Sequence, residues 1–378
     1  MFPHSETATR GGRTVPGSVA APAAAASRTA AAASATRWAA WDRFLEATPA
    51  TGFMQSSWWA DLRTTVGFTH FAAILKDSGG IVGGAMVQRL RHRSGVVFYY
   101  IQDGPVLPGD PSLAEDVLEA TLGDIEERRA SEREPVSHLR IEPRRERAEY
   151  AAEGRSGVVL PGFEPVAHKD RYVEPRDTLC VDLRPEHADI LAAMKPKGRY
   201  NISVARRHGV AIVEDTSPRG LADFLRIYRD TAGRQGFRTK PASYFESLIG
   251  VAAPRRRASI HLAEHAGTRL AAALVIRFGP RATYFYGGSL DLRRHVMAPY
   301  LLHFDIMCQA KQAGHEWYDL WGVAPEADEK HAWAGISVLK RRFGGREVRL
   351  VPTLDYVYDR SAYMRYQASE AAGRPRRS

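Results

Sequence analysis

A lysine lies beside the apolar face of a predicted helix near the end of the chain. Ile336, Leu339 and Phe343 recur at three- and four-residue spacing in the stretch GISVLKRRFGG, which predicts one apolar helix face. Lys340 falls at the edge of that face, whereas Arg342 is predicted to point away from it. From these residues alone, we expect the Lys340 stem to lie on apolar surface with its ammonium in water.

Three other clusters combine residue types that commonly bind ligands. Tyr284 and Tyr286 are predicted to share one face of a strand that ends in a Gly-Gly pair. Lys240 and Tyr244 bracket a turn before a helix, and residues 195–208 form a dense basic run that suits phosphate groups. Each cluster also has a purely structural interpretation, namely an aromatic core ladder, a solvated loop and a solvated helix face.

Composition narrows the partners and excludes several classes of site. The chain has 378 residues, a net charge of +10 and an isoelectric point near 9.7, which suit nucleic acid, a phosphorylated substrate or a membrane surface. Cys180 and Cys308 lie far apart without a CxxC motif or a histidine cluster, which predicts a reducing compartment and no zinc site. The chain contains no P-loop, HExxH, GxSxG or Rossmann glycine motif in a suitable context. We therefore expect no metal and no bound cofactor.

The pattern of elements predicts a mixed α+β fold with a duplicated plan. Residues 1–36 are rich in Ala, Ser and Thr and are expected to form a disordered arm. After them, two helices, a three-stranded meander, a helix and a strand occur twice, over residues 37–170 and 171–351. No apolar run has the length of a membrane span, which predicts a soluble, cytoplasmic protein.

Eight short motifs follow one another in order after the arm: FMQSSWWADL, YYIQDGPVL, LRIEPR, DTLCVDL, MKPKGRYNISVARRHGV, YFYGGS, YDLWGV and GISVLKRRFGG. With them the chain resembles the FemABX family, the aminoacyl-tRNA-dependent transferases that build peptidoglycan interpeptide bridges. The resemblance implies two tandem GNAT-like (acyl-CoA N-acyltransferase-like) domains, with residues 352–370 returning to the first. Because Val210 to Phe224 leaves no room for the helical hairpin that some members insert, the chain resembles the compact, FemX-like subtype.

The resemblance also implies a reaction and a set of site residues. An amine of a peptidoglycan precursor, UDP-linked or lipid-linked, would attack the ester of an aminoacyl-tRNA, which is a co-substrate and no bound cofactor. Lys340 falls at the family's lysine position, where a cation would stabilise the oxyanion or the leaving alkoxide. Glu142, Tyr244 and Tyr286 fall where compact relatives hold the sugar–peptide precursor. Lys240 stands where those relatives have an arginine.

One departure from the family pattern keeps other functions open. Asp61 replaces a lysine that compact relatives use for the nucleotide diphosphate, and Arg63 is the residue that we expect to compensate. Loss of this cation favours a second hypothesis, an aminoacyl-tRNA-dependent tailoring enzyme acting on an amine of an antibiotic or other secondary metabolite. An acyl-CoA-dependent GNAT acyltransferase, whose pyrophosphate loop is missing here, and a non-catalytic RNA-binding protein are further alternatives. The basic tail, residues 371–378, is a candidate contact for RNA or for anionic lipid at a membrane surface.

Overall fold

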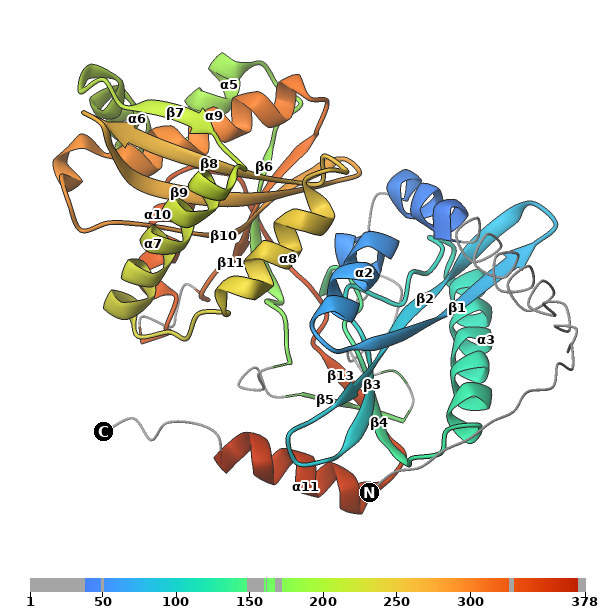
Figure 1. Cartoon of the computed structure of the whole chain (residues 1–378). Helices are drawn as coiled ribbons and strands as arrows, with labels where there is room; N and C mark the ends of the chain where they lie inside the picture. Colours follow the sequence, from blue (N-terminus) through green and yellow to red (C-terminus); the bar gives the residue numbers. More distant parts are fainter. Residues whose placement is uncertain are drawn as a thin grey trace, which may run out of the picture. The chain divides into compact units, whose positions relative to one another are not determined.

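The structure is a computed structural model that describes residues 38–48, 51–147, 160, 162–166, 172–325 and 330–372. Residues 41–378 form one compact unit that contains two β-sheets (Figure 1). The predicted arm lies outside the described residues, as does the basic tail from residue 373 onward. Within the described ranges, no helix combines the length and the apolar character that crossing a membrane requires.

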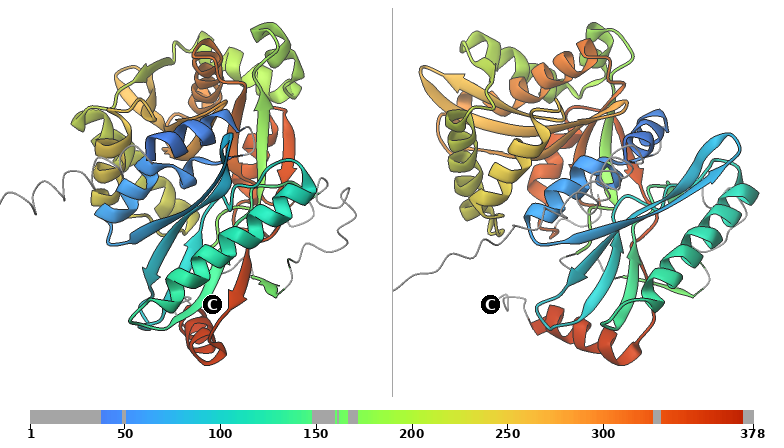
Figure 2. Two further views of the ribbon diagram at one scale, coloured as in Figure 1. Left: turned by 90° about the vertical axis from the view of Figure 1, so that its right-hand side faces the viewer. Right: turned by 45° about the vertical axis from the view of Figure 1, so that its right-hand side comes forward.

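The first sheet has six strands in the order β1-β2-β3-β4-β13-β5. Along β3 the side chains alternate between two helices, because successive strand residues point to opposite faces. Val97 and Tyr99 join the core under α3, whereas Phe98 and Tyr100 join the core under α11. Figure 2 shows these two helices on different faces of the sheet. The bounds are β1 (Thr69–Asp77), β2 (Gly80–Arg91), β3 (Val97–Ile101), α3 (Pro111–Ala130), β4 (Val136–Ile141), β5 (Phe163–Pro165), β13 (Leu354–Val357) and α11 (Arg360–Ala372).

Two short helices, η1 (Phe53–Gln55) and α2 (Ser57–Thr65), are fixed against the first sheet by buried polar side chains. The Ser56 hydroxyl caps α2 by accepting the N–H of Trp59 at 3.4 Å. The Gln55 amide donates to the Gln102 carbonyl at 2.5 Å and accepts the Met86 N–H at 2.7 Å. These bonds hold η1, and with it the following α2, beside the middle of β2 and the end of β3.

The second sheet has seven strands in the order β12-β6-β11-β10-β9-β8-β7. Helices α7 and α8 cover one face, and α5, α6 and α9 cover the other (Figure 1). β7 and the beginning of α7 occupy the stretch from Val210 to Phe224. The bounds are β6 (Asp177–Asp182), α5 (His187–Ala193), α6 (Pro196–Arg207), β7 (Ala211–Glu214), α7 (Pro218–Gln235), α8 (Ala242–Ala252), β8 (Ala258–His265), β9 (Thr268–Phe278), β10 (Arg281–Ser289), η2 (Arg294–Val296), α9 (Ala298–Gln312), β11 (Trp317–Gly322), α10 (Ala334–Arg341) and β12 (Arg346–Arg349).

Strand β13 follows the second sheet in the sequence but belongs to the first sheet. Leu354 lies opposite Ile141 of β4 on one side and Pro165 of β5 on the other. The chain therefore leaves the first sheet after β5, builds the second sheet, and adds a strand to the first before it ends. The exact domain limits, residues 37–170 and 171–351, stay a prediction.

Candidate functional site

A cavity of about 770 Å³ opens in the second sheet where strands β10 and β11 separate. These two strands pair in parallel over three residue pairs, the last being Thr283 with Asp319. Residues 284–290 and 321–322, which follow the last pair, line the cavity. Its volume is that of a small-molecule site, so the separated strands provide room for a ligand within the sheet.

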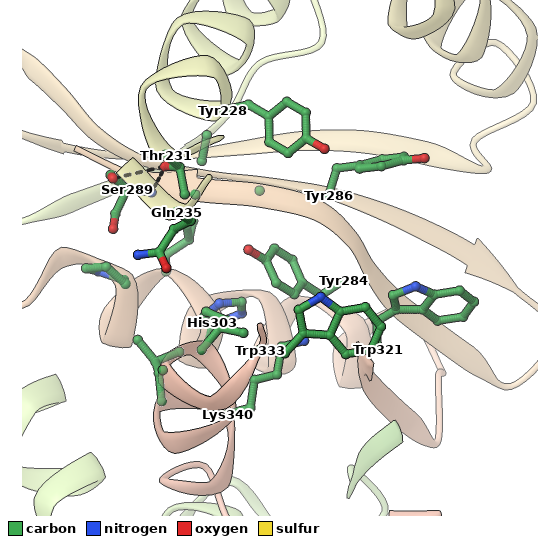
Figure 3. Close-up of a pocket in the computed structure, with 18 of the residues that line it drawn as sticks. Tyr228, Thr231, Gln235, Tyr284, Tyr286, Ser289, His303, Trp321, Trp333 and Lys340 are labelled. Atoms are coloured by element: carbon green, nitrogen blue, oxygen red, sulfur yellow. Dashed lines mark hydrogen bonds between the residues drawn. The ribbon is translucent and has the colours of Figure 1, made fainter. Parts of the chain in front are cut away.

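Lys340 lies on the last turn of α10 at the wall of this cavity, and only 6% of it is exposed. Its Nζ donates a hydrogen bond to the Gly322 carbonyl at 2.6 Å and lies 5.8 Å from the centre of the Tyr284 ring (Figure 3). The prediction of a lysine with its ammonium in water is therefore wrong. The carbonyl and the ring give the ammonium partners inside the protein, which a buried charge requires.

Helix α10 buries polar side chains beside the apolar stripe that the sequence predicted, of which Phe343 is fully buried and Leu339 is partly buried against the core. Ser337 and Lys340, three residues apart, are the buried residues of the helix, whereas Ile336 is 39% exposed. The Ser337 hydroxyl accepts the N–H of Ala324 at 2.8 Å, so this face is tied to the chain just after β11. Arg342 lines the cavity, which corrects the prediction that it points away.

Burial of Lys340 keeps its proton exchangeable near neutral pH. Burial lowers the pKa of Lys340 to about 7, and the Asp319 carboxylate opposes that shift. Asp319 is fully buried and accepts hydrogen bonds from Arg144 at 3.1 Å and from the N–H of Trp321 at 2.8 Å. Burial and the nearby Lys340 lower the pKa of His303 to about 3, so this imidazole stays neutral. Lys340 is thus both a hydrogen-bond donor and a candidate proton donor.

A bulge in β10 places two tyrosines on opposite faces of the sheet. The register against β9 shifts between Tyr284 and Tyr286, which inserts one residue and reverses the side-chain alternation. The ring centre of Tyr284 lies 4.6 Å from that of His303 in α9, whereas the ring centre of Tyr286 lies 5.1 Å from that of Phe245 in α8. Figure 3 shows Tyr284 beside His303 and Tyr286 beside Tyr228. The prediction that both tyrosines share one face is therefore wrong, although both line the cavity.

Four of the residues expected to bind the acceptor gather beside the cavity. The Tyr286 hydroxyl donates to the Tyr244 hydroxyl at 3.4 Å, and burial raises the pKa of Tyr244 to about 12. Lys240 is exposed, with its Nζ 5.8 Å from the centre of the Tyr244 ring. Arg63 is buried close enough to interact electrostatically with both tyrosines. Of these four, Tyr286 lines the cavity itself.

Glu142 lies deeper than the other predicted site residues and does not line the cavity. Its carboxylate accepts hydrogen bonds from the Tyr100 hydroxyl at 2.7 Å, the Thr353 hydroxyl at 3.0 Å and the N–H of Glu174 at 2.8 Å. Glu142 therefore reaches the cavity through Glu174, which does line it.

Arg63 does not replace a surface cation near Asp61. Its side chain points inward, where Nε donates to Gln88 at 2.9 Å and the guanidinium lies 3.9 Å from the centre of the Phe68 ring. Asp61 is exposed and forms an ion pair with Arg255 at 3.0 Å. The expectation that Arg63 compensates for Asp61 is thus not met by its position.

The lining of the cavity is strongly cationic. Six of its residues carry basic side chains: Lys197, Arg234, Arg293, Arg294, Lys340 and Arg342. Lys197 belongs to the basic run predicted from the sequence, so part of that run faces the cavity. Among the described residues that line it, Glu174 is the one carboxylate. Such a lining suits an anionic ligand.

Trp321 is a cavity residue that the sequence did not single out. Its φ of +64° lies in the left-handed region, which is unusual for a bulky residue and costs about 1–3 kcal/mol. The bulge between Asp319 and Gly322 accompanies it, and its ring packs 5.4 Å from Phe285 at the cavity wall. Only the WG pair after a predicted strand hinted at this bend.

Comparison with known proteins shows which family the chain belongs to. A family model described as the FemAB family matches residues 155–266 and 252–371, more than half of the chain. The chain belongs to the FemAB family. The lipid II:glycine glycyltransferase of Staphylococcus saprophyticus is 21% identical, covering 85% of this chain and 92% of that protein. The UDP-N-acetylmuramoylpentapeptide-lysine N(6)-alanyltransferase of Weissella viridescens is 26% identical over 42% of this chain and 47% of that protein.

The crystal structure of FemX has the same fold. It superposes with a TM-score of 0.74 at 17% identity, covering 87% of this chain and 97% of that one. The predicted mixed α+β fold class is confirmed, with two mixed sheets, and so is the resemblance to FemABX proteins.

The FemAB match contains most of the cavity. Glu174, Tyr286 and Lys340 fall inside the matched residues, whereas Arg63 and Glu142 precede them. Within the described part of this FemAB chain, no three His, Cys, Asp or Glu side chains gather in a way that would hold a metal ion.

Proposed function

We propose that this FemAB chain is a cytoplasmic aminoacyltransferase that moves an amino acid from aminoacyl-tRNA to an amine of a peptidoglycan precursor. The two relatives named above support the acceptor class, because one is named for lipid II and the other for a UDP-linked muramoyl pentapeptide. The cationic cavity supports the donor class, since lysine and arginine side chains contact phosphates in most nucleic-acid sites.

The observation that carries the proposal is the buried ammonium of Lys340 at the cavity wall. Attack of an amine on an ester forms a tetrahedral oxyanion, and its collapse releases a ribose alkoxide. A fixed donor aimed at such charge in a water-poor site lowers the free-energy barrier by about 3–4 kcal/mol. With a pKa of about 7, Lys340 is also suited to give a proton to the alkoxide as the C–O bond breaks.

The acceptor would enter beside Tyr286, with Arg63, Lys240 and Tyr244 behind it. Tyrosine hydroxyls and rings suit a sugar–peptide, and the exposed ammonium of Lys240 suits its phosphates or carboxylates. In this proposal Glu142 contributes through Glu174, whose N–H it holds at 2.8 Å.

A second candidate is an aminoacyl-tRNA-dependent tailoring enzyme that modifies an amine of a secondary metabolite. The exposed Asp61, paired with Arg255 at 3.0 Å, favours it, because this position lacks the lysine expected to hold a nucleotide diphosphate. The inward position of Arg63 strengthens that point.

A transfer assay tests both candidates. Purified full chain is given a pool of radiolabelled aminoacyl-tRNAs with UDP-N-acetylmuramoyl pentapeptide, with lipid II, or with no acceptor. We expect RNase-sensitive labelling of a muropeptide that falls about 10²–10³-fold in Lys340→Met. The matched control is Lys76→Met, an exposed lysine of β1 that should transfer normally.

The other outcomes separate the candidates. Consumption of aminoacyl-tRNA without labelling of either muropeptide would favour the tailoring enzyme. A chain that ignores aminoacyl-tRNA altogether, or a Lys340→Met variant that transfers at the wild-type rate, would overturn the proposal.

A further inference from the structure

We propose that Glu174 is the general base that accepts the proton of the attacking amine. This inference rests on the proposed function, because it concerns the acceptor of the same reaction. Glu174 would remove the proton from the amine, whereas Lys340 stabilises the oxyanion and protonates the leaving alkoxide.

The chemistry requires such a group. A lysine-type amine has an ordinary pKa of about 10.4, so at pH 7 only about one molecule in 2,500 is neutral and able to attack. A base placed at the amine removes this restriction and contributes typically about 10²–10⁴-fold in rate.

Glu174 is near Lys340 through directly packed residues. The neighbouring Pro175 lies against Gly322, so closely that a Cβ built on the glycine would stand 2.9 Å from the Pro175 Cβ. The carbonyl of the same glycine accepts the Lys340 ammonium at 2.6 Å. Lys340 and the neighbour of Glu174 thus both contact Gly322, and Glu174 and Lys340 both line the cavity.

A directed chain of hydrogen bonds fixes one oxygen of Glu174. Arg63 Nε donates to Gln88 at 2.9 Å, the Gln88 amide donates to Gln102 at 2.8 Å, and the Gln102 amide donates to Glu174 Oε1 at 2.9 Å. Trp59 Nε1 also donates to the Gln102 oxygen at 3.1 Å, so the Gln102 amide cannot flip without losing all three of its side-chain bonds. Among the described residues no hydrogen bond reaches Oε2, which leaves this oxygen for the substrate.

The other candidate bases are less suited. Glu142 is fully buried, and three donors already occupy its carboxylate. The His303 ring bonds to the Tyr318 hydroxyl at 2.9 Å, and its lowered pKa of about 3 makes it a weak base.

The surroundings of Glu174 adjust its basicity toward neutral pH. Burial, followed by the charge of Glu142, raises the pKa of Glu174 to about 7, and Asp103 acts in the same direction. Lys240, from the loop before α8, and Arg63, from α2, oppose the shift. A base with this pKa is half ionised at pH 7 and is stronger than an ordinary glutamate.

The proposed step balances as follows. The acceptor ammonium gives one proton to Glu174 Oε2, and the freed nitrogen lone pair forms the C–N bond to the ester carbonyl carbon. The C–O bond to the ribose then breaks as Lys340 gives a proton to that oxygen, which leaves as a hydroxyl, and the second proton from the nitrogen restores the Lys340 ammonium. Glu174 releases its proton to water, so the products are an amide, a ribose hydroxyl and one proton.

The test compares pH profiles of transfer for wild type, Glu174→Gln and Glu174→Asp between pH 5.5 and 8.5. In the wild type we expect the rate to fall below pH 7, as Glu174 is protonated, and to fall above pH 7, as Lys340 loses its proton. Glu174→Gln should lose about 10²–10⁴-fold in kcat at pH 7, with the KM for the acceptor nearly unchanged. Its rate should rise about tenfold per pH unit up to pH 7 with the neutral amine and then level off, because loss of the Lys340 proton offsets any further gain. The fall of the wild-type rate above pH 7 should therefore be absent from this variant.

Controls separate a base from a structural group. Glu174→Asp keeps a carboxylate and should retain the bell-shaped profile at a reduced rate, which also carries the test if the glutamine variant does not fold. Glu164→Gln, an exposed glutamate paired with Arg360, should match the wild type. A Glu174→Gln profile with the same bell shape as the wild type would overturn this inference and leave the proposed function standing. An inactive wild type would overturn both.

Discussion

Replacing Lys340 with methionine should stabilise the protein while it removes activity. The folded state lowers the pKa of this lysine from its ordinary value of 10.5 to about 7, because burial disfavours the ammonium. At about 1.4 kcal/mol per pH unit, the buried charge costs about 5 kcal/mol at pH 7 and below. Methionine has a similar length and no charge, so it removes this cost but leaves the Gly322 carbonyl without its donor, a loss of about 1–3 kcal/mol. We therefore expect a net gain of about 2–4 kcal/mol.

The pH dependence gives the sharper test. Between pH 7 and 10.5 the unfolded chain keeps the Lys340 proton while the folded chain loses it, so the unfolded state binds more protons and rising pH favours folding. Wild type should gain up to about 1.4 kcal/mol per pH unit relative to Lys340→Met over this window. The advantage of the variant should thus be largest near pH 7 and nearly gone at pH 9.

Urea unfolding followed by tryptophan fluorescence at pH 7, 8 and 9 measures this difference directly. Lys76→Met is the matched control, because the exposed Lys76 should change stability by less than about 0.5 kcal/mol at every pH. A difference between wild type and Lys340→Met that stays constant from pH 7 to 9 would refute the reasoning, since it would mean that the ammonium titrates as in water.

Two further predictions concern packing. Gly198→Ala should destabilise the protein by about 1–3 kcal/mol and slow transfer, because the new Cβ would stand 2.4 Å from the carbonyl oxygen of Arg342, a cavity residue. Urea unfolding measures the loss of stability. Gly233→Ala is the control, because open space surrounds Gly233. Asp355→Ala should cost about 3–5 kcal/mol without changing the acceptor KM of the folded enzyme, because it leaves the fully buried Arg140 without the carboxylate that now lies 2.7 Å away. Calorimetry of this variant against Asp61→Ala, which removes an exposed pair, would contradict the reasoning if the two losses were equal.

Much of the fold could be predicted from local sequence signals. In α7, Ser217 caps the first turn, Pro218 follows it, and Gly236 ends the helix at a φ of +70°. Residue types alone therefore indicate both ends of this helix. Within the basic run, α6 begins at Pro196, because proline is well suited to the first helical turn. The repeated order of meander, helix and strand predicted two similar halves, whereas their pairing, above all the return of β13 to β4, depends on contacts distant in sequence.

The site was less predictable because its residues are placed by irregularities and polar partners. Periodicity put Ile336 inside and Lys340 at the edge, yet the helix buries Lys340 because the Gly322 carbonyl lies 18 residues earlier in the chain and directly beneath it in the fold. A single inserted residue in β10 places Tyr286 on the face opposite Tyr284, and the alternation of residues along a strand does not predict this insertion. Glu174 carries no motif at all. Its importance follows from being the carboxylate of an otherwise cationic lining, which only the assembled cavity reveals. A hydrophobic pattern predicts which apolar residues are buried. It therefore fails for charged residues that the fold buries, such as Lys340.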